Sequence, residues 1–130
     1  MRRRINPDVV YIQDPECTLK LLQRLRSGGL VHIKPDGIAG ARGVEYMILG
    51  HARRFPTGIL DLARLSGCAV IPMLCLGRAR EFHLRFFPAL HLTAADSSEE
   101  FLTANLPVIT RALEAQVTQH PEEWRVWALA

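Results

Sequence analysis

The residues best suited to proton transfer in this chain are its five histidines and thirteen acidic residues. His91 and Asp96 lie five positions apart, and a carboxylate beside an imidazole can orient it as a general base. Chance alone gives about half a match to that spacing in a chain of this composition. His51, close in sequence to two arginines, is a further candidate. The sequence therefore names His91, Asp96 and His51 without deciding among them.

A second group of residues lies where a ligand could bind. Asp36 and Gly37 follow an apolar segment and Pro35, and α/β proteins commonly place ligand-binding residues at such a strand end. The alternative is a tight turn in which Asp36 accepts hydrogen bonds from local amides. Three nearby arginines could pair with a phosphate through their guanidinium groups, namely Arg42, Arg53 and Arg54.

Length and composition predict one compact domain over residues 1–130. The net charge of +3 is small and the basic residues are scattered, which argues against a nucleic-acid partner and allows a weak attraction to an anionic membrane surface. The N-terminal arginines precede Ile5-Asn6-Pro7-Asp8 instead of an apolar core, and no apolar run approaches about 20 residues. We expect a cytoplasmic protein whose membrane contact, if any, is peripheral to the inner face.

The three cysteines are odd in number and far apart in sequence. Cys68 and Cys75 lie in apolar surroundings, and with Cys17 they predict buried, reduced thiols. A zinc site would need a tighter cluster of Cys and His ligands. Neither a metal nor a cofactor is expected.

Hydrophobic periodicity predicts the strands that must position these residues. Apolar runs favour strands over residues 9–12, 30–34, 44–49, 68–76 and 82–87. The fourth run is apolar throughout, which is typical of a strand covered on both faces. The fifth alternates, with Phe82, Leu84 and Phe86 expected on its drier face. Residues 77–81 are expected to form a hairpin turn, and residues 51–56 are polar and expected to be exposed.

Three helices are predicted between and after these strands. The first is capped by Asp14, starts near Pro15 and ends at Gly28. The second is capped by Thr57, covers residues 58–66 and ends at Gly67. Its inward residues are expected to be Ile59, Leu62, Ala63 and Leu65.

The third helix follows an apolar stripe from Leu102 to Val117 and ends near His120. Pro107 lies inside the stripe, where it should either kink the helix or mark the first turn of a shorter helix that begins near Asn105. The alternation of strands and helices predicts an α/β domain, a mixed sheet of about five strands flanked by three helices.

Four short blocks follow one another in an order that resembles a known superfamily. They are Pro35-Asp36-Gly37, then Gly58 with Leu62-Ala63 and Gly67, then Val70-Ile71-Pro72, and finally His120-Pro121-Glu122-Glu123-Trp124. Together, over roughly residues 19 to 127, they are similar to the lysophospholipid acyltransferase superfamily. The resemblance is to the C-terminal half of its lipid A lauroyl and myristoyl acyltransferase branch.

This resemblance implies an acceptor-binding wall. By position, Asp36 and Gly37 would lie at the acceptor pocket and Gly58 would let a helix approach it, while Trp124 and Trp127 lock the last turn onto the core. The chain departs from the superfamily's pattern at two places where that pattern has basic residues that could bind an anion. Ile38-Ala39-Gly40-Ala41 separates the glycine from Arg42, and the chain ends in Ala128-Leu129-Ala130 where the branch has a basic stretch.

Pro35-Asp36-Gly37 is similar to a Pro-Glu-Gly block of the superfamily, and the superfamily's catalytic histidine and acid precede that block. Residues 1–29 of this chain contain no histidine. The resemblance therefore implies the acceptor-binding half of an acyltransferase that is inactive alone. Two alternatives remain open, a lipid- or acyl-carrier-binding module and an independent acyltransferase with an unconventional histidine base. An acyl thioester or lipid is the implied ligand. A homodimer or another partner chain is expected across the exposed edge of a half-sheet.

Overall fold

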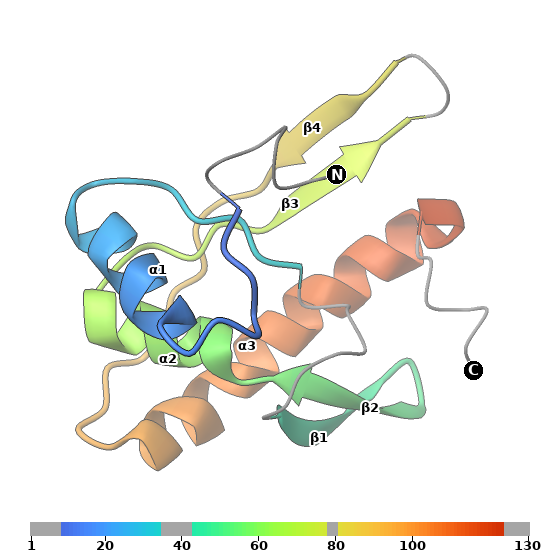
Figure 1. The fold of residues 1–130 in the computed structure, drawn as a ribbon. Coiled ribbons are helices and arrows are strands. Elements are labelled where there is room, and N and C mark those ends of the chain that lie inside the picture. Colours follow the sequence, from blue (N-terminus) through green and yellow to red (C-terminus); the bar gives the residue numbers. More distant parts are fainter. Residues whose placement is uncertain (1–8, 35–42, 78–80, 124–130) are drawn as a thin grey trace.

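The structure is a computed structural model that describes residues 9–34, 43–77 and 81–123. Within these ranges the chain forms three α-helices and two antiparallel hairpins (Figure 1). In chain order the elements are α1 (Cys17–Arg26), β1 (Gly43–Ile48), β2 (His51–Pro56), α2 (Gly58–Ser66), β3 (Met73–Leu76), β4 (His83–Phe86), α3 (Ser98–Gln119) and a short 3-10 helix, η2 (Pro121–Glu123). The α/β class and three helices are confirmed. The mixed sheet of about five strands is wrong, because the described strands form two separate two-stranded sheets.

The hydrophobic core lies where α2, α3 and the β1–β2 hairpin meet. Its buried members are Phe55, Leu60, Phe101 and Ile109, and the Tyr46 ring packs edge-on against Phe55 with centroids 5.6 Å apart. Leu62 and Ala63 of α2 are buried as expected, whereas Leu65 is 42% exposed and Leu60 is buried instead. Because apolar residues surround most of α2, its periodicity could not select the inward face.

The β1–β2 hairpin contains a strand that the sequence analysis missed. Residues 51–56 were expected to be polar and exposed, but β2 pairs with β1 from Ile48↔His51 to Gly43↔Pro56, and Phe55 is fully buried. Of its polar side chains, His51 and Arg53 share the side of Phe55 and Arg54 is on the opposite side. A two-residue turn, Leu49-Gly50, joins the strands with positive φ at both positions, as a type I′ turn requires.

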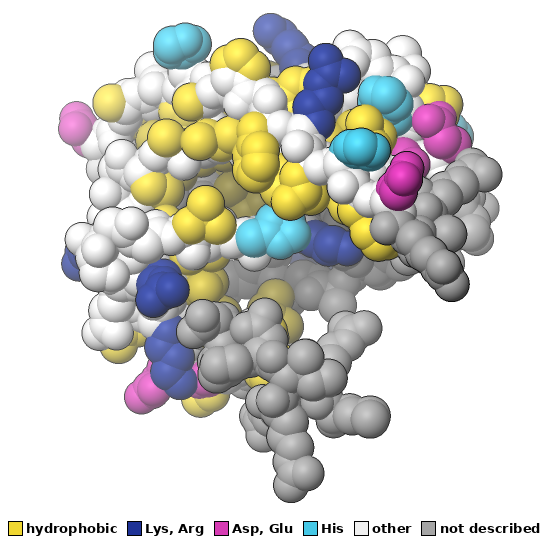
Figure 2. Space-filling view, turned by 90° about the horizontal axis from the view of Figure 1, so that it is seen from above, with side chains coloured by type: hydrophobic (Ala, Val, Ile, Leu, Met, Phe, Trp, Pro, Cys, Tyr) yellow, Lys and Arg dark blue, Asp and Glu magenta, His cyan; other side chains and the backbone are white. Residues whose placement is uncertain are grey.

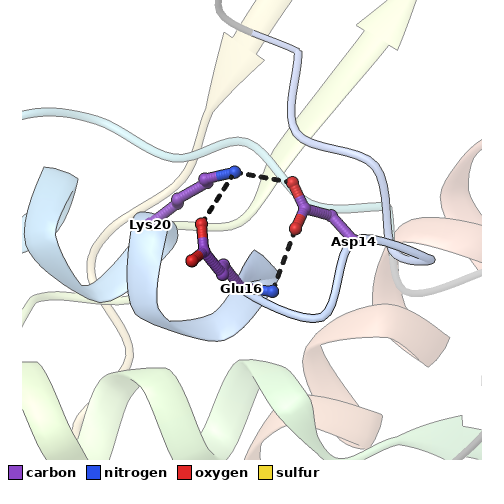
Figure 3. A network of polar contacts seen from close by, with 3 residues as sticks. All are labelled: Asp14, Glu16 and Lys20. Carbon is purple, nitrogen blue, oxygen red and sulfur yellow. Dashed lines mark hydrogen bonds and ion pairs between the residues drawn. The ribbon is translucent and has the colours of Figure 1, made fainter.

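Helix α1 is held at its start by a small polar network (Figure 3). Asp14 accepts a hydrogen bond from the backbone N–H of Glu16 at 2.9 Å, and Lys20 Nζ lies 2.7 Å from Asp14 and 3.3 Å from Glu16. The hydrogen bonds to Asp14 and then to Glu16 raise the pKa of Lys20 above its ordinary value. Gly28, at positive φ, follows the helix as expected.

Two predicted strands near the N-terminus are wrong. Residues 9–12 and 30–34 have no strand structure, although both are rich in β-branched residues. A strand exists only when its backbone groups pair with a neighbour. In the described ranges, no strand of either hairpin pairs with these segments.

Helix α3 is a single long helix that runs through Pro107. Ser97 caps it by accepting the backbone N–H of Glu100 at 3.1 Å, and His120 ends it as expected. The shorter helix that would begin near Asn105 is therefore wrong. Pro107 removes only one hydrogen-bond donor, and the packed face of Phe101 and Ile109 spans the site on both sides. No described helix has both the length and the apolar character needed to cross a membrane.

The β3–β4 hairpin departs from its sequence pattern in burial. Residues 77–81 connect two antiparallel strands as expected, but regular strand structure in the run 68–76 covers only Met73–Leu76. Phe82, Leu84 and Phe86, expected on the drier face, are 67%, 57% and 60% exposed, and Cys75 is exposed rather than buried. Cys17 and Cys68 are half-buried. The predicted cover on both faces of this run is thus absent from the described part of the chain.

Candidate functional site

One end of the β1–β2 hairpin brings together several residues that the sequence singled out. Gly43, the residue that follows the Asp36–Arg42 segment in sequence, pairs with Pro56, and α2 begins two residues later at Gly58. Asp36, Gly37 and Arg42 themselves lie outside the described residues. The end of the hairpin where β2 passes into α2 is therefore the candidate acceptor site, which we call the β2–α2 junction.

The two arginines of β2 point to opposite faces of the hairpin, because successive side chains on a strand alternate. Arg53 is the cross-strand partner of Tyr46 and shares the core-facing side with Phe55. Arg54 is opposite Glu45 on the exposed side. The two guanidinium groups therefore start from opposite faces of the hairpin.

Arg54 is the arginine that reaches the junction. A Cβ atom built on Gly43 would lie 3.0 Å from Arg54 Cγ and 3.3 Å from Arg54 Nε, so the Arg54 side chain folds over the glycine. The same Cβ would lie only 2.7 Å from the carbonyl oxygen of Phe55. Gly43 thus makes the room in which the Arg54 guanidinium sits at the end of the hairpin.

Gly58 has a different environment from the one expected for a close approach. It is exposed, and no described atom lies within 4 Å of a Cβ built on it. The Thr57 side chain makes no capping bond, while the Thr57 carbonyl accepts the N–H groups of Leu60 and Asp61 at 2.9 and 3.1 Å. The packing that requires a glycine is therefore found at Gly43, a position that the sequence analysis did not single out.

The histidine candidates do not form a catalytic pair. His91 and Asp96 are both exposed, and in the part of the chain that the structure describes no hydrogen bond or ion pair joins them. His51 is the first residue of β2, about 17 Å along the strand from Pro56 at the junction. His51 therefore lies at the opposite end of β2 from the β2–α2 junction.

Among the described histidines, only His120 lies near a carboxylate, with Nδ1 3.7 Å from Glu122 Oε1. That separation is too long for a hydrogen bond. The described ranges also hold no group of three or more Cys, His, Asp or Glu residues arranged to bind a metal ion.

The comparison with known proteins decides the family. The model of the bacterial lipid A biosynthesis acyltransferases matches residues 1–129. This chain belongs to that family. Two curated relatives are phosphatidylinositol mannoside acyltransferases from two strains of Mycobacterium tuberculosis. Each is 29% identical over 110 residues, a stretch that covers 82% of this chain and 32% of the relative.

The chain therefore spans about a third of the length of the curated relatives that it matches. No solved structure matches the chain. The resemblance drawn from the four blocks is confirmed at the level of the acyltransferase family.

The family's blocks have mainly packing roles in the described structure. Leu62 and Ala63 are buried in the interface of α2 with its neighbours. In the apolar-Pro block, the carbonyl groups of Val70 and Pro72 accept hydrogen bonds from Leu90 and Phe87, which extends the pairing of the second hairpin. The His-Pro-Glu-Glu block ends α3, and Glu123 Oε1 lies 3.5 Å from the Gly77 amide. Trp124 and Trp127 lie outside the described residues.

Asn105 is the polar residue that the sequence analysis missed. It is fully buried, accepts the Thr93 N–H at 2.7 Å and donates to the carbonyl groups of Thr93 and Phe101 at 2.8 and 2.9 Å. These bonds fix the segment that carries His91 against α3. An available signal was its spacing, since Asn105 falls four residues from both Phe101 and Ile109 on the apolar stripe.

Proposed function

We propose that this chain supplies the acceptor-binding part of a lipid acyltransferase, with the headgroup at the β2–α2 junction. The observation that carries the proposal is the meeting of Gly43, Arg54 and the first turn of α2 at one end of a hairpin, in a chain of the lipid A acyltransferase family. The relatives are named for phosphatidylinositol mannoside. We therefore propose an acceptor lipid with a phosphate-bearing headgroup.

In this proposal Arg54 pairs with the phosphate, because a guanidinium offers donors in the geometry that phosphate oxygens accept. Asp36, Gly37, Arg42 and Gly58 complete the acceptor site. Arg53 takes no part, since its side chain is on the opposite face of β2. The assignment is thus narrower than the sequence analysis, which kept both arginines of the strand.

Binding of a water-soluble headgroup tests the assignment directly. We propose titrating the chain with glycerophosphoinositol and comparing Arg54→Gln with Arg53→Gln, a matched control one residue away. Loss of a charged hydrogen bond of about 1.5–3 kcal/mol weakens binding roughly tenfold or more for Arg54→Gln. Equal weakening by both substitutions, or by Arg53→Gln alone, would contradict the assignment.

We also propose that the 130-residue chain transfers no acyl group by itself. The support is that no described histidine makes a hydrogen bond with a carboxylate that could orient it. Incubation with a radiolabelled acyl thioester and a lysophospholipid should give no product above the protein-free rate. Turnover that disappears in His91→Ala or His51→Ala would instead establish an independent enzyme with an unconventional base.

The remaining proposals concern place and partners. We propose that the chain works in the cytoplasm at the inner membrane face, with an acyl thioester or lipid as its ligand. We also propose a second copy or another partner chain across the exposed edge of a hairpin, because two-stranded sheets leave unpaired backbone groups at both edges. A purified chain that stays monomeric at high concentration by light scattering would rule out the second copy.

A further inference from the structure

The exposed face of the β1–β2 hairpin places an acidic residue beside the arginine of the proposed acceptor site. The register pairs Glu45 with Arg54, and directly opposed residues of two antiparallel strands project from the same face. Both side chains are exposed. On the other face of the hairpin, Arg53 is opposite Tyr46. Of the two arginines of β2, Arg54 is therefore the one whose cross-strand partner is a carboxylate.

The Arg54 side chain is directed past this carboxylate. Its Cγ and Nε atoms lie over Gly43, which is two residues from Glu45 along β1 and on the same face. Within the described ranges, no ion pair joins Glu45 to Arg54. Successive same-face positions on a strand are about 7 Å apart. An anion bound by Arg54 over Gly43 would therefore have the negative charge of Glu45 on the order of 7 Å away.

Close neighbours, rather than the whole chain, set the potential at Arg54. The net charge of +3 is small, and on the face seen from above neither acidic nor basic side chains form one large field of a single sign (Figure 2). Charges farther apart than about 8 Å are largely screened at physiological ionic strength. The hairpin and α2 contain two acidic residues, Glu45 and Asp61. Asp61 accepts a hydrogen bond from Ser98 Oγ at 2.9 Å, which leaves Glu45 as the carboxylate on the Arg54 face.

We propose that Glu45 is a specificity-determining residue, which shifts the acceptor site toward a phosphodiester and against a phosphomonoester. This inference rests on the proposed function of the β2–α2 junction and narrows its ligand to a headgroup with a single negative charge. A phosphodiester carries one negative charge, whereas a phosphomonoester carries close to two above its second pKa of about 6. The charge of Glu45 therefore opposes binding of the monoester about twice as strongly.

Coulomb's law gives the size of the effect. In water, a unit charge about 7 Å from another changes a binding constant by roughly two- to threefold. Removing the charge of Glu45 should strengthen binding of the diester by about that factor and binding of the monoester by about its square, roughly four- to ninefold. The ratio of the two binding constants should therefore move about two- to threefold toward the monoester.

Titration of the unsubstituted chain and of Glu45→Gln with two soluble probes measures this ratio. The probes are glycerophosphoinositol, a phosphodiester, and inositol monophosphate, a phosphomonoester, at about pH 8 where the monoester is doubly charged. The titrations use about 0.01 M salt, where the screening length is about 30 Å. In about 1 M salt, where that length is about 3 Å, the ratio should become the same for both proteins. A purely structural role of Glu45 would not produce this dependence on salt.

Glu122→Gln is the matched control, because it removes the same charge from the short helix η2 beyond the far end of α3. Helix α3 begins at Ser98, which contacts Asp61 in the first turn of α2, and its 22 residues span about 33 Å. The ratio of binding constants should therefore be unchanged in Glu122→Gln. Circular dichroism establishes that both variants are folded.

Two results would overturn the inference. If Glu45→Gln strengthens both probes by the same factor, Glu45 acts as a competing partner of Arg54 and does not discriminate between ligand charges. If Glu122→Gln moves the ratio as far as Glu45→Gln does, the effect belongs to the net charge of the chain. Failure of the proposed function gives a different result, because Arg54→Gln would then weaken neither probe.

Discussion

The two hairpins of this chain have the same topology and opposite environments. The β1–β2 hairpin packs one face into the core, where Phe55 and Ile48 are buried, and α3 holds its turn through a bond from Leu49 N–H to Glu114 Oε1 at 3.0 Å. The β3–β4 hairpin is held mainly at its base, and every residue of β4 is exposed. A strand's apolar content therefore does not determine its burial, because the neighbouring elements decide it.

The difference also separates two kinds of surface. Around the β1–β2 hairpin, burial on one face leaves a defined end at which Gly43 and Arg54 are positioned, which suits recognition of a headgroup. Around β3–β4 the apolar residues are presented without a described partner. The first hairpin thus has a buried face and a fixed end, whereas the strand β4 of the second is exposed throughout.

The largest expected effect is on the free energy of unfolding, which should respond differently to a substitution in each hairpin. Phe55→Ala removes a fully buried ring from the core, so the free energy of unfolding should fall by about 3–5 kcal/mol. Phe86→Ala, at the exposed position of the other hairpin, should change it by less than about 0.5 kcal/mol. Urea unfolding of both variants measures the difference. Comparable losses would mean that the β3–β4 face is buried in solution.

The next effect concerns the segment that leads from β4 to α3. Asn105→Ala removes the side-chain partner of two part-buried groups, the N–H and the carbonyl of Thr93, at a cost of about 2–3 kcal/mol. Asn105→Asp keeps an acceptor for the Thr93 N–H but loses both donations, so it should also destabilise. Hydrogen exchange at the Thr93 amide should speed up in Asn105→Ala. Unchanged exchange there would show that Asn105 does not hold this segment.

Alanine substitutions at the two glycines near the β2–α2 junction test which glycine lies in close contact with its neighbours. Gly43→Ala places a methyl group 2.7 Å from the Phe55 carbonyl and against Arg54, so it should destabilise by about 1–3 kcal/mol. Gly58→Ala enters open space at the start of α2 and should be neutral or slightly stabilising. Thermal unfolding of the pair is the measurement. The reverse order would place the close approach at Gly58, as the resemblance implied.

The sequence predicted those parts of the fold that depend on local residue properties. It did not predict the parts that depend on pairing between distant segments. The ends of α1 and α2 could be predicted because Gly28 and Gly67 adopt positive φ, a property of the residue itself. The strand at residues 30–34 could not be excluded, because strand formation depends on a partner that no local pattern reveals. The same reason hid β2, whose apolar contribution to the core is essentially Phe55.

The candidate site was predicted only in part, because its geometry depends on strand pairing that no local pattern reveals. Block order identified the family. The assignment of Arg53, Arg54 and Gly58 to an acceptor site stays a prediction. Which arginine reaches the junction depends on strand register, and the sequence analysis had not recognised the strand. The role of Gly43 depends on a contact with a residue twelve positions away, Phe55. Such contacts follow from pairing rather than from residue type.

The smallest expected effect is at the turn that lets the first hairpin form. Leu49 has a φ of 49°, in the left-handed region that costs a branched L-residue about 1–2 kcal/mol, whereas asparagine tolerates it. Leu49→Asn should therefore raise the free energy of unfolding by about 0.5–1 kcal/mol, measured in urea. Leu49→Asn keeps the N–H that donates to Glu114, and Glu114→Ala in both backgrounds removes that hydrogen bond as a control. A destabilised Leu49→Asn would show that apolar contacts of Leu49 outweigh its backbone strain, and that α3 holds this turn through packing as well as through Glu114.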